Sequence, residues 1–185
     1  MKRLFVALST LIISGAAFAQ GYVGIAGGPT KHNFSCSGTS SCDTSDVGYK
    51  LFGGYKFTPM FAGELGYTDF GKEKAKLGSA SSDIRTTSLW VGGAAFFDLA
   101  PSLTASARLG IASNKAKAAA SFGGSSVSSS NTKASPYFGL GIGYEFAPQI
   151  TITGGLDFTK SEASIGGISE SANVRLLSIG LTFGF

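Results

Sequence analysis

Six charged residues stand among glycine, serine and threonine at alternate positions of the chain, a pattern suited to ion pairing inside a narrow interior. They are Lys50, Lys56, Glu64, Arg108, Glu145 and Asp157. A buried charge is costly unless it is paired, so these groups should neutralise one another. We expect an interior charge network in which Arg108 pairs with Glu64 or with Glu145. A gated path for water or ions along the same residues is the alternative.

Two cysteines, Cys36 and Cys42, lie in a segment rich in serine and glycine. A disulfide between them closes about seven residues and restricts the segment by roughly 2 kcal/mol in the chain-entropy description. A metal site would need more ligands than two thiols and the nearby His32. We therefore predict a Cys36–Cys42 disulfide and no metal ligands.

His32 is the single histidine, so it is the natural candidate for a catalytic base. A hydrolase that modifies lipid A would need a serine, a base and an orienting acid in reach of one another. Loop serines are plentiful, but the sequence has no His-x-Ser pair and no Gly-x-Ser-x-Gly elbow. We predict a protein that is not an enzyme, with no catalytic and no cofactor-binding residues.

Lysines recur in the segments between the regular runs of the sequence. The densest group is Lys72, Lys74 and Lys76. An ammonium group binds phosphate as a compact point charge. We expect this group to be a candidate lipopolysaccharide contact, and an ordinary solvated loop is the alternative.

A period of two organises the chain that must position these residues. In the last run Leu177, Ile179, Leu181, Phe183 and Phe185 are apolar, with small residues between them. Seven more alternating runs precede it, near 21–30, 47–57, 61–68, 89–97, 103–111, 137–146 and 150–159. Runs of about 9–12 residues match the length that a tilted strand needs to cross a bilayer. The first and last runs should pair, so that no strand edge faces lipid.

The connections between these runs alternate in length. Three are tight and contain a proline: 58–60, 98–102 and 147–149. Four are longer: about 31–46, 70–84, 113–135 and 160–173. Short turns at one rim and long loops at the other are typical of outer-membrane barrels. A soluble eight-stranded barrel, the alternative, has no reason to place every short turn at one rim.

The two faces of the runs indicate which side meets water. One face is apolar, and the other holds mainly glycine, hydroxyl residues and isolated charges. A water-facing surface normally carries charged residues at roughly a quarter or more of its positions. We therefore place the apolar face outward in lipid and the polar face inward. Trp90 and Phe96 then fill the lumen, whereas we assign Tyr22 to an aromatic girdle at the membrane interface.

The first nineteen residues are typical of a secretory signal peptide. A positive start and a short apolar stretch precede a small-x-small site at Ala17–Ala19. We predict a signal peptide over 1–19 and one domain over 20–185. The net charge of +4 falls to about +2 without Lys2 and Arg3, which is too weak to indicate a nucleic-acid partner.

Three motifs carry a resemblance: VGYKLFGGYKF at 47–57, ELGY at 64–67 and LTFGF at 181–185. With them the mature chain resembles the small outer-membrane β-barrel family that includes the outer membrane protein A transmembrane domain. The resemblance implies an all-β fold: an eight-stranded antiparallel up-and-down transmembrane β-barrel with three short periplasmic turns and four longer extracellular loops. It also implies that the outer-membrane assembly machinery recognises the aromatic-ended strand from Leu177 to Phe185 as an assembly signal.

These observations lead to a functional expectation. We expect a monomer in the outer membrane of a Gram-negative bacterium, with a structural or membrane-integrity role and a surface-interaction role. Its expected partners are outer-membrane lipids, lipopolysaccharide and an extracellular ligand bound by the loops; it needs no cofactor. A small, low-conductance, porin-like channel is the alternative, and a lipid-A-modifying enzyme is less favoured.

Overall fold

A computed structural model of the chain describes residues 20–32, 41–43, 45–77, 80–122, 125–165 and 168–185. Side chains are described for 21–31, 46–71, 85–117, 130–160 and 173–185. The predicted signal peptide, Cys36 and the side chain of Cys42 lie outside the described residues, so these predictions remain predictions.

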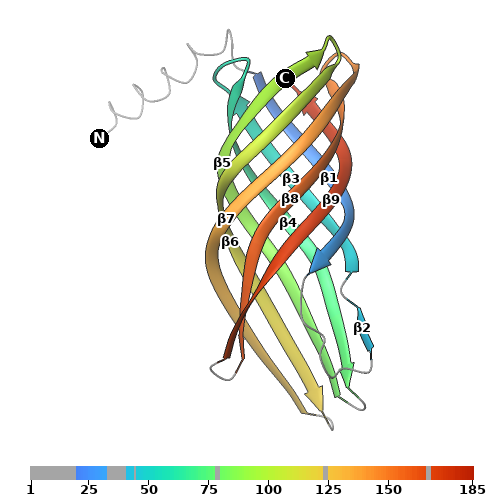
Figure 1. Cartoon of the computed structure of the whole chain (residues 1–185), viewed down its shortest axis with the longest axis vertical. Helices are drawn as coiled ribbons and strands as arrows, with labels where there is room; N and C mark the ends of the chain where they lie inside the picture. Colours follow the sequence, from blue (N-terminus) through green and yellow to red (C-terminus); the bar gives the residue numbers. More distant parts are fainter. Residues whose placement is uncertain (1–19, 33–40, 44, 78–79, 123–124, 166–167) are drawn as a thin grey trace, which may run out of the picture.

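The described elements are all β-strands, and they stand side by side in a tall, twisted barrel (Figure 1). The strands are β1 (Gln20–His32), β2 (Ser41–Asp43), β3 (Ser45–Lys56), β4 (Phe61–Leu77), β5 (Ala80–Ala100), β6 (Leu103–Phe122), β7 (Ser125–Ala147), β8 (Ile150–Ile165) and β9 (Ile168–Gly184). The described part of the chain holds no helix with the length and apolar character that a membrane crossing requires.

Eight of these strands close into an antiparallel barrel. Each pairs with the strand next to it along the chain, and β1 joins β9, with Tyr22 opposite Gly184 and His32 opposite Val174. β2 adds three residues beside the far part of β4 and belongs to no other described ladder. The predicted pairing of the first and last runs is therefore confirmed, as is the eight-stranded up-and-down barrel.

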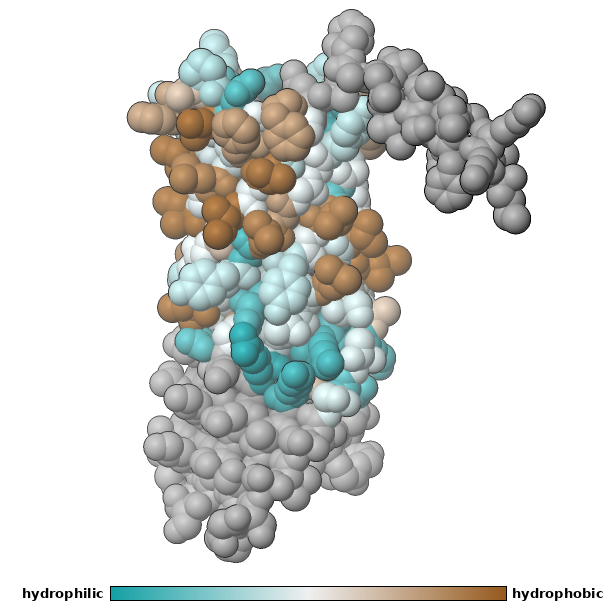
Figure 2. Space-filling view, turned by 180° about the vertical axis from the view of Figure 1, so that it is seen from behind, coloured by the Kyte–Doolittle hydropathy of each residue, from teal (hydrophilic) through white to brown (hydrophobic). Residues whose placement is uncertain are grey.

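The period of two divides the barrel into an apolar outside and a polar inside. Among the residues with described side chains, thirty large apolar ones are exposed, including Leu177, Ile179, Leu181, Phe183 and Phe185. Figure 2 shows the outer wall from behind: hydrophobic residues cover its turn-bearing part, and a hydrophilic zone follows toward the other rim. An exterior of this kind is stable only against an apolar medium, which confirms the predicted outward direction of the apolar face.

The three proline-containing connections are short and lie together at one end of the barrel, which we call the turn rim (Figure 1). The first is fixed by the Thr58 hydroxyl, which accepts a hydrogen bond from the Phe61 amide at 2.9 Å. At the opposite end the strands continue far beyond the expected runs; β6 and β7 remain paired from Leu103–Tyr144 to Phe122–Ser125. Most of the segment expected as a loop over 113–135 is thus strand, and we call this end the extension rim.

Candidate functional site

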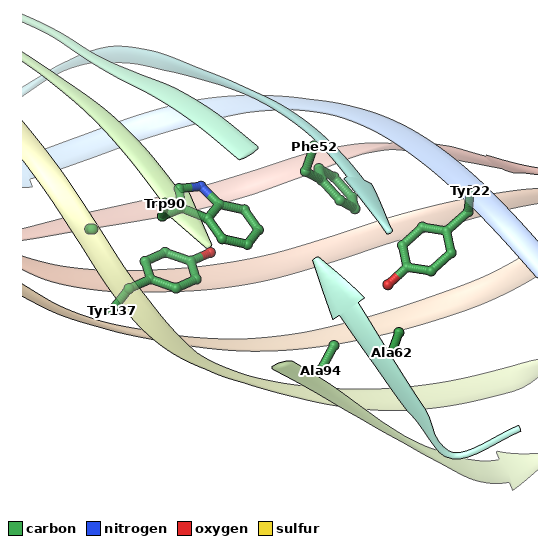
Figure 3. Packing of buried hydrophobic residues seen from close by; sticks show 7 residues of the cluster. Tyr22, Phe52, Ala62, Trp90, Ala94 and Tyr137 are labelled. Carbon is green, nitrogen blue, oxygen red and sulfur yellow. The ribbon is translucent and has the colours of Figure 1, made fainter. Parts of the chain in front are cut away.

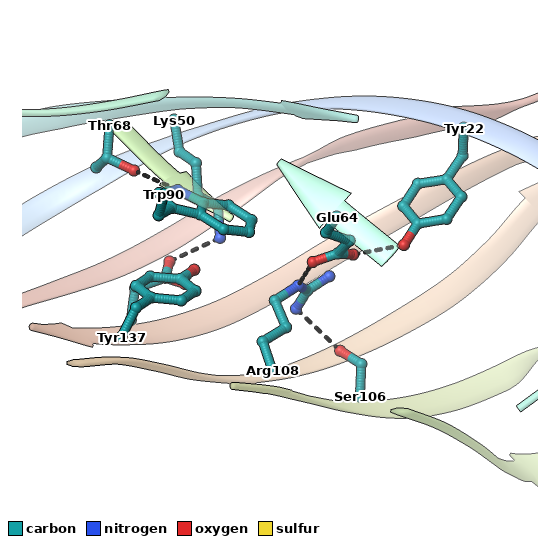
Figure 4. Close-up of polar contacts among 9 residues, drawn as sticks. Tyr22, Lys50, Glu64, Thr68, Trp90, Ser106, Arg108 and Tyr137 are labelled. Carbon is teal, nitrogen blue, oxygen red and sulfur yellow. Dashed lines mark hydrogen bonds and ion pairs between the residues drawn. The ribbon is translucent and has the colours of Figure 1, made fainter. Parts of the chain in front are cut away.

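The interior of the barrel gathers the chemistry-bearing residues that the alternation points inward. Glu64 on β4 accepts two hydrogen bonds: one from the Tyr22 hydroxyl at 2.6 Å and one from Arg108 Nε at 2.7 Å. Arg108, on β6, also donates from Nη1 to the Ser106 hydroxyl at 3.1 Å (Figure 4). Glu64 and Arg108 are 3% and 7% exposed, so this ion pair is buried.

A second ion pair crosses the lumen closer to the extension rim. Lys50 Nζ on β3 lies 2.7 Å from Asp157 Oδ2 on β8, and both residues are almost completely buried. The Tyr137 hydroxyl donates a hydrogen bond to the other oxygen of Asp157. Tyr137 stacks on Trp90, with ring centroids 4.4 Å apart and an interplanar angle of 14°. Each buried carboxylate therefore has one cation and one phenol as partners.

Aromatic rings fill the space around the two ion pairs. Phe52 lies between them, with Lys50 Nζ 5.1 Å and Arg108 Cζ 5.4 Å from its ring centroid. Figure 3 shows its ring among those of Tyr22, Trp90 and Tyr137, all of which point into the lumen. Trp90 Nε1 donates to the Thr68 hydroxyl at 3.2 Å, so its one polar atom is satisfied. This layer of rings and ion pairs, which we call the plug, spans the middle of the barrel.

A cavity of about 470 Å³ lies between the plug and the turn rim. Lys56 and Phe96 form part of its wall, and Lys56 Nζ lies 4.6 Å from the Phe96 ring centroid. Glu145 also lines the cavity but is exposed at its mouth. In the described part of the chain neither Lys56 nor Glu145 makes an ion pair, so both stand apart from the two buried pairs. Glu145 lies beside a break in the β7–β8 register, next to the short turn that joins these strands.

A smaller apolar group lies inside the barrel on the other side of the plug. Phe70, Val174 and Leu176 pack together and are buried. On this side of the plug the single O–H of Thr30 is shared between the carbonyl oxygens of Asp46 and Phe70, each 2.9 Å from the Thr30 hydroxyl oxygen. The interior is thus layered along the barrel axis: cavity, plug, then this apolar group.

Several predicted residues lie where the structure describes no side chain. The far part of β4 carries Lys72, Lys74 and Lys76, and its side chains are not described. His32 ends β1, and its side chain is likewise not described. Cys42 lies on β2 without a described side chain, and Cys36 lies outside the described residues. Among the described residues no group of three His, Cys, Asp or Glu side chains is arranged to hold a metal ion.

Sequence reasoning placed one important side chain on the wrong face. Tyr22 was assigned to the aromatic girdle, but it is 6% exposed and its hydroxyl binds Glu64 inside the barrel. The signal was present in its neighbours: Val23 and Ile25 are outward-facing, so alternation alone directs Tyr22 inward. Trp90 and Phe96 lie on the inner face, as predicted.

Comparison with known proteins agrees with this architecture. Neisserial surface protein A superposes with a TM-score of 0.64 at 19% identity, covering 89% of this chain and 97% of its own. Ail, the attachment invasion locus protein of Yersinia pestis, gives 0.61 at 16% identity, covering 90% and 99%. OprG of Pseudomonas aeruginosa gives 0.56 at 13% identity, covering 90% and 95%. No curated protein sequence matches the chain.

These similarities are at the level of the fold, because every identity is below 20%. The family assignment rests on the sequence itself. The family model of the OmpA-like transmembrane domain matches residues 16–185, which includes every described strand. The closed barrel with its apolar wall and polar, plugged lumen belongs to the outer membrane of a Gram-negative bacterium, and the chain is a member of the OmpA-like transmembrane domain family.

Proposed function

We propose that this protein is a non-enzymatic structural barrel of the outer membrane whose lumen is closed in the resting state. The single observation that carries the proposal is the plug: two buried ion pairs, Lys50–Asp157 and Glu64–Arg108, with the Phe52 ring between them. An eight-stranded barrel has an interior only wide enough for its own side chains. Each charge of the plug is neutralised locally, so neither sign of ion is attracted into the lumen.

The outer parts of the molecule support a second aspect of this proposal, a surface-interaction role. β5, β6 and β7 carry the barrel well beyond its apolar wall on the extracellular side. Such a projection can present residues to extracellular partners, and Ail was also solved in complex with the heparin analogue sucrose octasulfate. We propose that the protein acts as a monomer, is inserted by the outer-membrane assembly machinery, and contacts lipopolysaccharide through Lys72, Lys74 and Lys76.

A small channel is the second candidate function, and the cavity favours it. The turn-rim half of the lumen is already hollow as far as Tyr22, Phe52 and Arg108. Among the residues whose side chains the structure describes, those of the plug and the apolar group of Phe70, Val174 and Leu176 would have to move. A transient rearrangement of the plug would then connect the periplasm with the outside.

Planar-bilayer recording of the purified mature protein separates the two functions. We expect no discrete conductance steps from the wild-type barrel. The matched variant Phe52→Ala/Trp90→Ala keeps both ion pairs and removes aromatic volume, so it should admit water and show measurable conductance. Its folding is checked by the shift in electrophoretic mobility on heating. Regular conductance steps from the wild type would contradict the closed-lumen proposal and favour the channel.

A further inference from the structure

Three neighbouring strands end their outward-facing apolar stripe on a cation. On β9 the outward residues run from Phe183 to Leu177, and the next outward position is Arg175. On β8 the stripe ends at Phe158 and is followed by Lys160, and on β1 Lys31 takes the corresponding place. All three cations are exposed on the wall that β8, β9 and β1 form together (Figure 1).

The strand register brings these three side chains into one patch. Lys31 is directly opposite Arg175, and Arg175 is directly opposite Phe158. Lys160 is two residues further along β8, on the same outer face as Phe158. Adjacent strands lie about 4.8 Å apart and two residues along a strand span about 6.6 Å, so Lys31 and Lys160, the outer members, have Cα atoms roughly 12 Å apart, with Arg175 between them. We call Lys31, Lys160 and Arg175 the tri-cationic patch.

No described carboxylate neutralises the tri-cationic patch. None of its three residues forms an ion pair with any described acid. The Arg175 guanidinium lies 5.9 Å from the Phe158 ring centroid, which holds it against the wall with its donors available. Its orientation therefore suits an external anion at the edge of the apolar surface.

A second basic group on the far side of the barrel differs from the tri-cationic patch in its carboxylate partner and in its distance from the apolar stripe. Arg85 on β5 pairs with Asp69, and this hydrogen-bonded carboxylate raises the pKa of the Arg85 guanidinium above its ordinary value. Lys115 and Lys117 on β6 stand near it, Lys117 directly opposite Arg85. Here the polar residues Thr87 and Ser113 separate the cations from the apolar stripe. This group is further from lipid and is partly neutralised.

We propose that the tri-cationic patch binds the phosphate groups of a phosphorylated glycolipid of the outer leaflet, with lipid A as its ligand. The patch lies at the extracellular edge of the apolar wall, at the depth of the lipid headgroups. An ammonium or guanidinium at this depth forms short charge-assisted hydrogen bonds with phosphate, and the acyl chains lie along the apolar stripes below. The tri-cationic patch is a lipopolysaccharide contact distinct from the one proposed for Lys72, Lys74 and Lys76, and it uses none of the plug residues.

Native mass spectrometry of the refolded full-length mature barrel in zwitterionic detergent tests this site. The probes are bisphosphorylated lipid A, the same lipid with its phosphates removed, and sucrose octasulfate. The test variant is Lys31→Gln/Lys160→Gln/Arg175→Gln, and the matched control is Arg85→Gln/Lys115→Gln/Lys117→Gln. We expect the test variant to bind bisphosphorylated lipid A more weakly by about tenfold or more, because each cation near a charged headgroup contributes attraction.

The other arms decide whether the effect is specific. The control variant should retain most of the wild-type binding, and the dephosphorylated lipid should bind wild type and test variant equally. Equal losses in the two variants would mean that only overall charge matters, which would overturn the site. Undiminished binding by the test variant would overturn it as well. Binding of sucrose octasulfate without binding of lipid A would replace the proposed lipid by a soluble polyanion.

Discussion

At the scale of single residues, the plug shows how a narrow barrel tolerates buried carboxylates. Glu64 and Asp157 are each held by one cation and one tyrosine hydroxyl, so each carboxylate oxygen that is engaged has its own donor. Such pairs contribute little net stability compared with apolar side chains, but losing one partner leaves an uncompensated charge. The cost of a substitution therefore depends on what it leaves behind.

Arg108→Met makes this dependence measurable. The variant leaves the Glu64 carboxylate buried with only the Tyr22 hydroxyl, and we expect it to lower the free energy of unfolding by about 3–5 kcal/mol. The double variant Arg108→Met/Glu64→Met removes the orphaned charge and should recover most of this loss. Urea unfolding in lipid vesicles measures both.

Lys56→Met is the matched control for this cycle. Lys56 is also a lumen cation, but its described contact is the Phe96 ring, so its loss should cost less than about 1 kcal/mol. If Lys56→Met were as destabilising as Arg108→Met, or if the double variant were no better than the single one, orphaned charge would not be the cause.

The inward direction of the plug residues could be predicted from sequence, but their pairing could not. Alternation alone placed Lys50, Arg108 and Asp157 inside. Which groups meet depends on the stagger between strands, and Lys50 reaches Asp157 across a lumen that separates β3 from β8. Stagger is a property of the closed barrel, so the sequence left Glu64 and Glu145 open as partners of Arg108.

At the scale of elements, the strands are longer than the apolar pattern that reveals them. β6 and β7 continue their pairing through alanine- and serine-rich segments such as 118–122 and 125–130. These residues give no alternation in polarity, because small side chains are tolerated on either face. The ladder continues since backbone hydrogen bonds need no side-chain pattern, which is why sequence reasoning marked 113–135 as a loop.

The β1–β9 seam, where the first and last strands pair, leaves no room for a side chain at Gly180, and Gly180→Ala tests this close approach. A Cβ at Gly180 would lie 2.1 Å from the Ile25 carbonyl oxygen and 2.6 Å from Ala26 Cα. Backbone on both sides cannot move without opening the seam, so we expect a loss of about 2 kcal/mol or more in the free energy of unfolding. Denaturant unfolding of the refolded barrel measures this loss.

Gly63→Ala is the matched control, because a Cβ at this outward position would meet nothing within 4 Å. Its effect on stability should be small and slightly favourable, since alanine loses less backbone entropy on folding than glycine. A Gly180→Ala barrel as stable as the Gly63→Ala barrel would mean that the seam relaxes easily.

At the scale of the whole molecule, the fold follows from a periodic pattern more than from particular residues. Neisserial surface protein A shares 19% identity with this chain, yet the two superpose with a TM-score of 0.64. A bilayer requires that outward residues be apolar, that inward residues fit the lumen, and that the strands close so that every backbone group is hydrogen-bonded. Many different side chains meet these requirements. The same reasoning explains why the sequence predicts the barrel but does not identify an extracellular partner, because the period-two pattern carries no information about partners.

Assembly in the outer membrane depends on the whole chain, and Phe185→Ala tests whether the C-terminal aromatic residue is its signal. The Phe185 amide donates to the Gly21 carbonyl at 2.8 Å, which ends the β1–β9 seam, and the side chain is 67% exposed on the outer face. We expect Phe185→Ala to lower the amount of heat-modifiable barrel in the outer membrane several-fold, because the closing strand loses its aromatic end.

Phe146→Ala removes an equally exposed ring (70%) from the same rim and should leave that amount nearly unchanged. Refolding into vesicles should give the two variants similar stabilities, since neither ring is buried, so a difference seen only in cells assigns Phe185 to recognition. Equal amounts of both variants in the outer membrane would reject the assembly signal.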